Sequence, residues 1–138
     1  MAQLKINDLS VGDWVSDKNG IIAQIRGMEC WSDGYVINVQ TKAGTITNLT
    51  EAGVCPIPIT PEILEKNGFV KNDAYLHKID IDDNITIGVR RQSDGYMFEL
   101  KREKRRIGEL LAIIRGLRNV HQLQHALRLA GVEKEIVV

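Results

Sequence analysis

Two histidines, His121 and His125, lie four residues apart in a segment with helical periodicity. This spacing puts both imidazoles on one helix face, as in zinc metallopeptidases. Those enzymes place a glutamate directly after the first histidine as general base, whereas this chain has Gln122 there. No third ligand is assigned, and His77 is the only other histidine. We therefore predict no metal, no cofactor and no catalytic residues.

The same helix suggests a different chemistry, the binding of an anion. A helix N-terminus has spare amide donors and a positive dipole end, and both attract phosphate groups. We predict an anion- or nucleotide-binding surface from the polar flank of this helix and from a basic run that precedes it. Solvated or partly packed side chains are the alternative interpretation. The candidate ligand-binding residues are His121, Gln124, His125, Arg128, Arg102, Arg105 and Arg106.

Charge is distributed unevenly, although the net charge is zero. Residues 1–89 carry 7 Lys/Arg and 12 Asp/Glu, whereas residues 90–138 carry 11 and 6. The basic C-terminal half can attract a nucleotide or nucleic acid. The alternative is a strand edge whose charges prevent edge-to-edge pairing. Opposite charge in the two halves also predicts a salt-sensitive, head-to-tail homo-oligomer.

Trp14, Trp31 and Tyr35 are the aromatic residues of the N-terminal region. Because the chain has so few aromatic residues, we expect all three to fill the core. The alternative is that Trp31 and Tyr35 bind a partner, since small barrels often bind peptides or nucleic acids through aromatics at a loop-lined edge. Trp31 is the better candidate for exposure because it directly precedes the turn-forming residues 32–34.

Other chemical motifs are incomplete in this sequence. The glycines stand singly at turns and form neither of the two glycine-rich phosphate loops. The acidic segment Asp80–Asn84 resembles a calcium loop, but it lacks the glycine and the terminal glutamate at the required offsets. We interpret this segment as a hairpin turn.

The elements that must position these residues begin with short strands. Alternating apolar residues bounded by glycine-containing turns are typical of antiparallel strands in a small barrel. We therefore predict an SH3-like barrel over residues 1–59, which ends in an extended connector or edge, Cys55–Ile59, where two prolines each remove a ladder donor. The predicted strands are one that ends at Val15, then Ile21–Ile25, Tyr35–Val39 and Thr45–Leu49.

Residues 60–138 are predicted to form a short helix, a β-meander and a C-terminal helix, packed with the barrel as one unit. Thr60 is a good N-cap for a helix Pro61–Lys66, and Gly68 lies just past its end. Asn119 and Gln122 form a capping box for a helix over 120–130. Residues 107–118 fit a strand or a helix. The predicted meander strands are Ala74–Asp82, Ile85–Arg91 and Tyr96–Lys101.

Composition is that of an ordinary globular protein, with 43% hydrophobic and 26% charged residues in 138. The first residues lack the apolar region of a secretion signal, and no stretch approaches the ~18 apolar residues of a membrane span. Cys30 and Cys55 lack metal or redox spacing, so we predict reduced thiols. These features predict the cytoplasm of a bacterial host and no contact with membranes.

Three segments carry a resemblance to known sequences: Leu9–Val15, Pro56–Phe69 and Val120–Leu127. With GDWV, TPEILEKNGF and VHQLQ as their cores, they resemble small uncharacterised proteins of Bacteroides-type gut bacteria and their phages and prophages. The resemblance implies an origin in such a bacterium or its mobile elements. It implies no activity, because none is established for that group.

The sequence as a whole predicts a mainly β (α+β) fold and a non-enzymatic binding protein of phage or mobile-element origin. A host or phage protein is the expected partner. One alternative is a counter-defence protein that sequesters a nucleotide or another phosphate ligand, and another is a nucleic-acid-binding accessory protein. A hydrolase built on the histidine pair ranks last.

Overall fold

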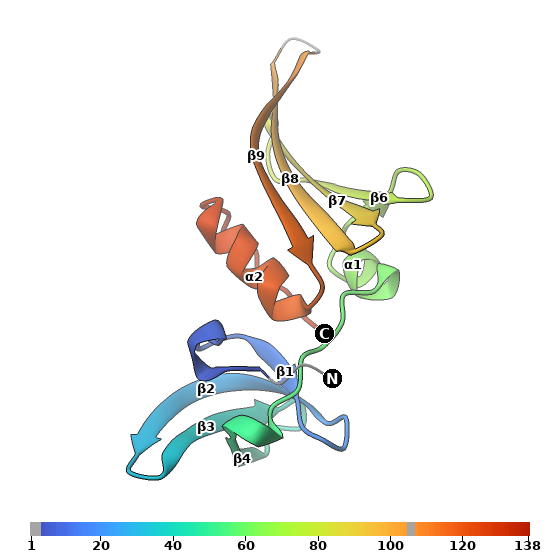
Figure 1. The fold of residues 1–138 in the computed structure, drawn as a ribbon. Coiled ribbons are helices and arrows are strands. Elements are labelled where there is room, and N and C mark those ends of the chain that lie inside the picture. Colours follow the sequence, from blue (N-terminus) through green and yellow to red (C-terminus); the bar gives the residue numbers. More distant parts are fainter. Residues whose placement is uncertain (1–3, 105–106) are drawn as a thin grey trace. The chain divides into compact units, whose positions relative to one another are not determined.

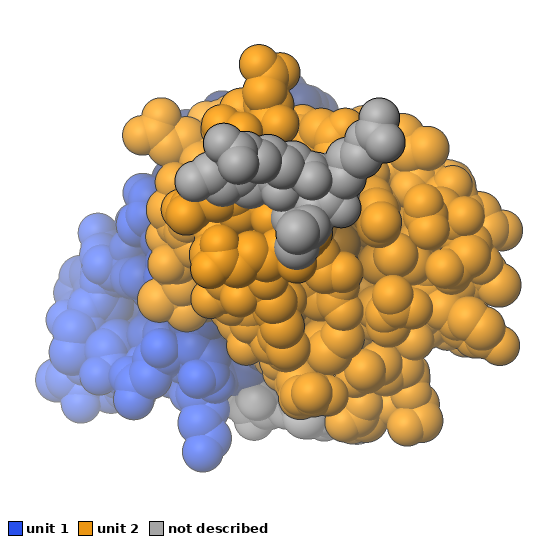
Figure 2. Space-filling view, turned by 90° about the horizontal axis from the view of Figure 1, so that it is seen from above, with its two compact units in different colours: residues 1–57 blue, residues 58–138 orange. Residues whose placement is uncertain are grey.

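The computed structural model describes residues 4–104 and 107–138, and the mainly β fold is confirmed. The chain divides into two compact units, residues 1–57 and residues 58–138, which Figure 2 colours separately. Each unit contains one antiparallel sheet. Among the described residues, no helix has the length and apolar character needed to cross a membrane.

The first unit is a four-stranded meander in the order β1-β2-β3-β4, and its sheet curls into a half-barrel (Figure 1). Alternate residues face the core, as the sequence pattern predicts: Ile25 pairs with Val39, and both are fully buried. Its elements are η1 (Ile6–Asp8), β1 (Trp14–Ser16), β2 (Ile22–Trp31), β3 (Gly34–Thr41), β4 (Ile46–Thr50) and η2 (Glu51–Gly53).

The entry into β1 is fixed by a buried carboxylate. The Asp13 carboxylate accepts a hydrogen bond of 2.8 Å from the Ser10 amide, and the residue is fully buried. The backbone on either side bonds to β2, with Gly12 N donating to Ile25 O and Ile25 N donating to Asp13 O. The turn that precedes the first strand is therefore held by the sheet itself, which explains why a polar residue is buried there.

The second unit is a five-stranded meander with helices packed against it. The strand order is β5-β6-β7-β8-β9, and α2 runs alongside β9 (Figure 1). The segment 107–117, which fitted a strand or a helix, is β9 and pairs along its length with β8. The elements are α1 (Pro61–Lys66), β5 (Val70–Lys71), β6 (Leu76–Asp80), β7 (Ile85–Gln92), β8 (Gly95–Lys104), β9 (Ile107–Leu117) and α2 (Val120–Leu129).

Both helices begin where the sequence predicts. The Thr60 hydroxyl accepts a hydrogen bond from Ile63 N at 3.2 Å, and Gly68 after α1 has φ +89°, the left-handed conformation that glycine adopts without strain. Asn119 and Gln122 form the expected capping box, in which Gln122 Oε1 accepts from the Asn119 amide at 3.0 Å. These local patterns therefore fix the start of each helix.

Asn67 ties the C-terminal segment to α1. Its Nδ2 donates to Val137 O at 2.7 Å and to Ile63 O at 2.8 Å, and its Oδ1 accepts from Val137 N at 2.8 Å. The side chain is buried, so these bonds form away from water. The neighbouring Ile136 and Val138 are buried as well. Asn67 therefore works as a clamp that closes the second unit.

Asn67→Ala is expected to lower the free energy of unfolding by about 2 kcal/mol, because it leaves the Val137 amide and carbonyl without their partner. Urea denaturation followed by circular dichroism measures the change. Asn72→Ala, at an exposed position in the same unit, is the matched control and should stay within about 0.5 kcal/mol of the wild type. Equal stability of the two variants would contradict the clamp.

Candidate functional site

The β2–β3 hairpin of the first unit extends past its neighbouring strands. Strand β1 pairs with β2 only at residues 22–24, and β4 pairs with β3 only from residue 36 onward. The end of the hairpin, residues 28–35, therefore reaches beyond most of the sheet (Figure 1). On the β1 side this end has no neighbouring strand, and on the other side the pairing with β4 stops at Val36.

Trp31 and Tyr35 lie at this hairpin end, with 58% and 40% of their surface exposed. The prediction that they fill the core is wrong, because the half-barrel core ends before the hairpin does. Trp14, the third aromatic residue, is half-buried. An exposed tryptophan is unusual, since this residue is highly buried on average. The two exposed rings therefore need an explanation other than packing.

The two rings project from opposite faces of the hairpin. Trp31 pairs with Gly34 and Tyr35 pairs with Cys30, and adjacent pairs in an antiparallel ladder point to opposite sides. The Trp31 indole N–H donates to Glu29 Oε2 at 3.3 Å, and Glu29 lies on the same face two residues earlier. The structure therefore places one aromatic ring on each side of the hairpin rather than a single aromatic platform.

A cleft of about 370 Å³ opens beside Tyr35. Its walls come from residues 33–36 at the start of β3 and from residues 50–52, where β4 passes into η2. Asp33 and Glu51 supply carboxylates to the lining. The cleft therefore combines an aromatic ring with two acidic groups, a combination suited to a cationic side chain.

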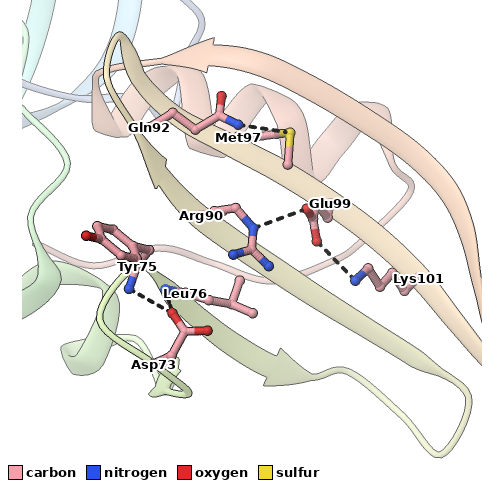
Figure 3. Close-up of polar contacts among 8 residues, drawn as sticks. All are labelled: Asp73, Tyr75, Leu76, Arg90, Gln92, Met97, Glu99 and Lys101. Carbon is pink, nitrogen blue, oxygen red and sulfur yellow. Dashed lines mark hydrogen bonds and ion pairs between the residues drawn. The ribbon is translucent and has the colours of Figure 1, made fainter.

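The second unit carries a different arrangement, a buried carboxylate between two cations (Figure 3). The Glu99 side chain is only 9% exposed; its Oε1 lies 3.6 Å from Arg90 Nε and its Oε2 lies 3.2 Å from Lys101 Nζ. Gly88 pairs with Glu99 in the ladder and makes room for the carboxylate. A carboxylate in this position needs its cationic partners, because an unpaired buried charge is costly.

Neighbouring groups extend this polar face. The Asp73 carboxylate accepts hydrogen bonds from Tyr75 N at 2.8 Å and Leu76 N at 3.0 Å. The pKa of the fully exposed Asp73 is lowered, most of all by the hydrogen bond from Tyr75 and then by the hydrogen bond from Leu76 and the charge of Arg90. Figure 3 shows these residues on the side of the sheet away from α2. The charges of Glu99, Arg90 and Lys101 on this face are paired with one another, although Glu99 Oε2 lacks a hydrogen-bond partner among the described residues. We interpret this face as structural.

A second hollow, of about 420 Å³, lies where the β7–β8 turn meets the start of α1. Arg91, Glu62 and Tyr96 are among its lining residues. Burial raises the pKa of the Tyr96 phenol, Arg91 lowers it and Glu62 raises it. This hollow presents a neutral hydroxyl between charges of both signs.

The predicted anion-binding residues of α2 are mostly enclosed. His121 and Gln124 are buried, His125 is half-buried and only Arg128 is exposed. The rings of His121 and His125 contact edge to face, with centroids 5.8 Å apart. Their helical spacing does bring the two imidazoles together. An anion site on this flank stays a prediction.

The basic run lies elsewhere in the unit. Arg102 pairs with Ile85 and with Glu109, near the β8–β9 turn, whereas α2 begins after the opposite end of β9. Arg105 and Arg106 fall outside the described residues. The structure therefore does not unite the predicted anion-binding residues in one place.

The remaining candidate ligands occupy separate elements. His77, on β6, has its Nε2 3.5 Å from Glu65 Oε1 on α1. In the described part of the chain, no three histidine, cysteine or acidic side chains gather into a metal-binding group. The segment after Asp80 is a hairpin turn, as predicted, and the Asp82 carboxylate accepts from the amides of Asn84 and Ile85.

Sequence reasoning missed the buried Glu99 and the cleft beside Tyr35. An isolated glutamate between hydrophobic residues of a predicted strand signals an inward-facing charge, and Gly88 on the preceding strand signals the space for it. Nothing local to the sequence could reveal the cleft, because it depends on how far β4 extends along β3.

Comparisons with known proteins found no match: no protein-family model, no curated protein and no solved structure is significantly similar to this chain.

Gly88→Ala should destabilise the second unit by about 1–2 kcal/mol, because the added Cβ would lie 3.2 Å from Leu76 Cδ1 and 3.4 Å from Glu99 Oε2. Chemical denaturation measures this change. Gly108→Ala is the matched control, since nothing lies within 4 Å of the Cβ built there. If both substitutions have the same effect, the packing of the carboxylate against Gly88 is not a stabilising constraint.

The Tyr96 phenol is expected to ionise above its ordinary value of 10.0. Its raised pKa stabilises the fold fully below that value, and this contribution is lost as the pH rises through the higher folded-state pKa. Absorbance titration at alkaline pH should show that Tyr96→Phe removes a phenol component that ionises above 10.0. Loss of a component that ionises at or below 10.0 would refute the assignment.

Proposed function

We propose that this chain is a protein-binding module and that its first unit holds a partner polypeptide at the β2–β3 hairpin end. The single observation that carries the proposal is the exposure of Trp31 and Tyr35 at a hairpin end that extends beyond the sheet. Tryptophan and tyrosine are the residues that most often dominate binding energy at protein interfaces. Their exposure in the free chain leaves this surface available.

The charges around the hairpin end favour a partner segment with basic residues. Glu29, Asp33 and Glu51 surround the two rings. A lysine or arginine of the partner can enter the cleft beside Tyr35, where it meets two carboxylates and the aromatic ring. Apolar residues of the same segment can cover Met28, which is 37% exposed on the Tyr35 side of the hairpin, and can continue past the hairpin end to Trp31 on the other side. Aromatic contacts would supply affinity, and the carboxylates would select the sign of charge.

The resemblance to proteins of Bacteroides-type bacteria and their phages supports a host or phage protein as the partner. The nucleotide-binding alternative has weaker support, because His121 and Gln124 are buried. The hairpin end is acidic, so the surface proposed here suits a basic polypeptide better than a nucleic acid.

A displayed library of random peptides tests the proposal. Selection on the wild-type chain, with counter-selection on Trp31→Ser/Tyr35→Ser, should enrich peptides that join Lys or Arg to apolar residues. Each single substitution should weaken a selected peptide by about tenfold or more, because it removes a dominant contact. Titration followed by fluorescence anisotropy of the labelled peptide measures this affinity in each variant.

Val11→Ser is the matched control, since Val11 is 55% exposed in the same unit but lies outside the hairpin. It should leave peptide affinity unchanged. Peptides that bind the double variant as tightly as the wild type, or a selection that enriches nothing, would refute the proposal.

A further inference from the structure

The hollow between the β7–β8 turn and the start of α1 has the size of a small-molecule site. Its volume of about 420 Å³ lies within the range of ~300–1,000 Å³ that is typical of ligand pockets. All of its lining residues belong to the second unit. One wall is the segment 59–62, and the other is formed by residues 91, 92, 95 and 96. The hollow therefore lies within one compact unit and has two walls from different elements.

Both walls are held in place by Arg118, which directly precedes the capping box of α2. Its carbonyl accepts a hydrogen bond from Ile59 N at 2.9 Å, and its Nε donates to Asp94 O in the β7–β8 turn at 3.1 Å. Gly95 in this turn has φ +132°, and a Cβ there would lie only 2.6 Å from Leu117 O. The turn is therefore packed closely against the end of β9. A ligand would find the two walls already ordered, which lowers the cost of binding.

Two opposite charges line the hollow without pairing. Arg91 on β7 and Glu62 in the first turn of α1 are both exposed lining residues. Within the part of the chain that the structure describes, neither side chain forms an ion pair. The preceding residue, Arg90, differs because it has Glu99 3.6 Å away on the opposite face of the sheet. The charges of Arg91 and Glu62 are therefore left for a ligand.

Tyr96 lies beside both charges. It pairs with Arg91 in the β7–β8 ladder, so the two side chains leave the sheet on the same face. Burial raises the pKa of its phenol, Arg91 lowers it and Glu62 raises it, so both charges act on one hydroxyl group. A neutral phenol can donate a hydrogen bond to an anion and accept one from a cation. Tyr96 can therefore contact either charged group of a ligand.

We propose that this hollow binds a small zwitterion of amino-acid chemistry, whose carboxylate pairs with Arg91 and whose ammonium group pairs with Glu62. Ile59 and Pro61 in the first wall supply apolar surface for the carbon skeleton. A free amino acid and a short peptide with free termini share this chemistry. The proposal is independent of the partner surface on the first unit.

The pair of charges selects against other ligands. A simple anion would be attracted by Arg91 but repelled by Glu62, and the reverse holds for a simple cation. A neutral molecule would displace water from both charges and leave them uncompensated, which is costly. A ligand that carries both signs compensates both groups, so the arrangement discriminates by repulsion as well as by attraction.

Leucine and its blocked forms test the requirement for two charges. Millimolar leucine should shift the ring resonances of Tyr96 in NMR spectra of the whole chain, with the assignment made from Tyr96→Phe and with Tyr35 in the first unit as the internal control. N-acetylleucine lacks the ammonium group and leucinamide lacks the carboxylate. Each should bind about tenfold or more weakly than leucine, because it leaves one charge of the hollow unpaired.

Dileucine and its two blocked forms distinguish a peptide from a free amino acid. The compound that binds more tightly, leucine or dileucine, identifies the source of the zwitterion. In either case the form with both charges should bind more tightly than its acetylated and amidated forms.

Neutral variants should change which blocked form is preferred. Arg91→Gln should favour the amidated form, because only the Glu62 carboxylate remains, and Glu62→Gln should favour the acetylated form. Lys71→Gln and Glu133→Gln are the matched controls, since both residues are exposed in the same unit and neither lines the hollow. They should bind all forms as the wild type does.

The preference compares two ligands on one variant, so a loss of stability cannot produce it, and circular dichroism checks that each variant is folded. The proposal would be overturned if neither leucine nor dileucine shifts the Tyr96 resonances. Blocked forms that bind as tightly as the free compounds, or the same preference in Arg91→Gln and Glu62→Gln, would also overturn it.

Discussion

Each unit contains an open sheet. The rest of the structure depends on which side chains and backbone groups such a sheet leaves exposed or unpaired. A strand buries its side chains and pairs its backbone only where a neighbour runs beside it. In the first unit β2 extends past β1, and the β3–β4 pairing stops one residue short of Tyr35, so the hairpin end carries exposed aromatic rings. In the second unit, among the described residues, β9 has β8 on one side only. The surface proposed for binding a partner lies where the first sheet ends.

The interior of the second sheet shows the opposite case, in which a polar group is enclosed with its partners. Glu99 has a cation on either side and a glycine opposite, so its charge is compensated where it stands. Asn67 similarly satisfies both backbone groups of Val137. Such networks favour a single arrangement of the polar groups. The polar centre of the second sheet is therefore structural, whereas the exposed hairpin end of the first unit is the surface available for binding a partner.

The sequence predicts those features that depend on a few neighbouring residues. Thr60, Gly68 and the Asn119–Gln122 capping box each bond within one helical turn, so their types and spacing are enough to place α1 and α2. The turn at Asp82 is equally local. Strand alternation likewise revealed the meander of the second unit, because one face of the sheet is apolar.

Features that depend on partners far along the chain could not be predicted in the same way. Residues 107–117 became a strand through pairing with β8, and nothing in their own periodicity selects strand over helix. Trp31 and Tyr35 were expected in the core because the chain has few aromatic residues, yet their exposure depends on where the neighbouring strands end. His121 and Gln124 were assigned to a polar flank of α2, yet tertiary packing buries both.

Hydrogen exchange measured on the whole chain, with and without a selected basic peptide, tests most directly the claim that the hairpin end is an interaction surface. The account predicts that amides of the hairpin end, residues 28–35, exchange more slowly once the peptide is added. A hairpin end whose exchange the peptide leaves unchanged would contradict the account.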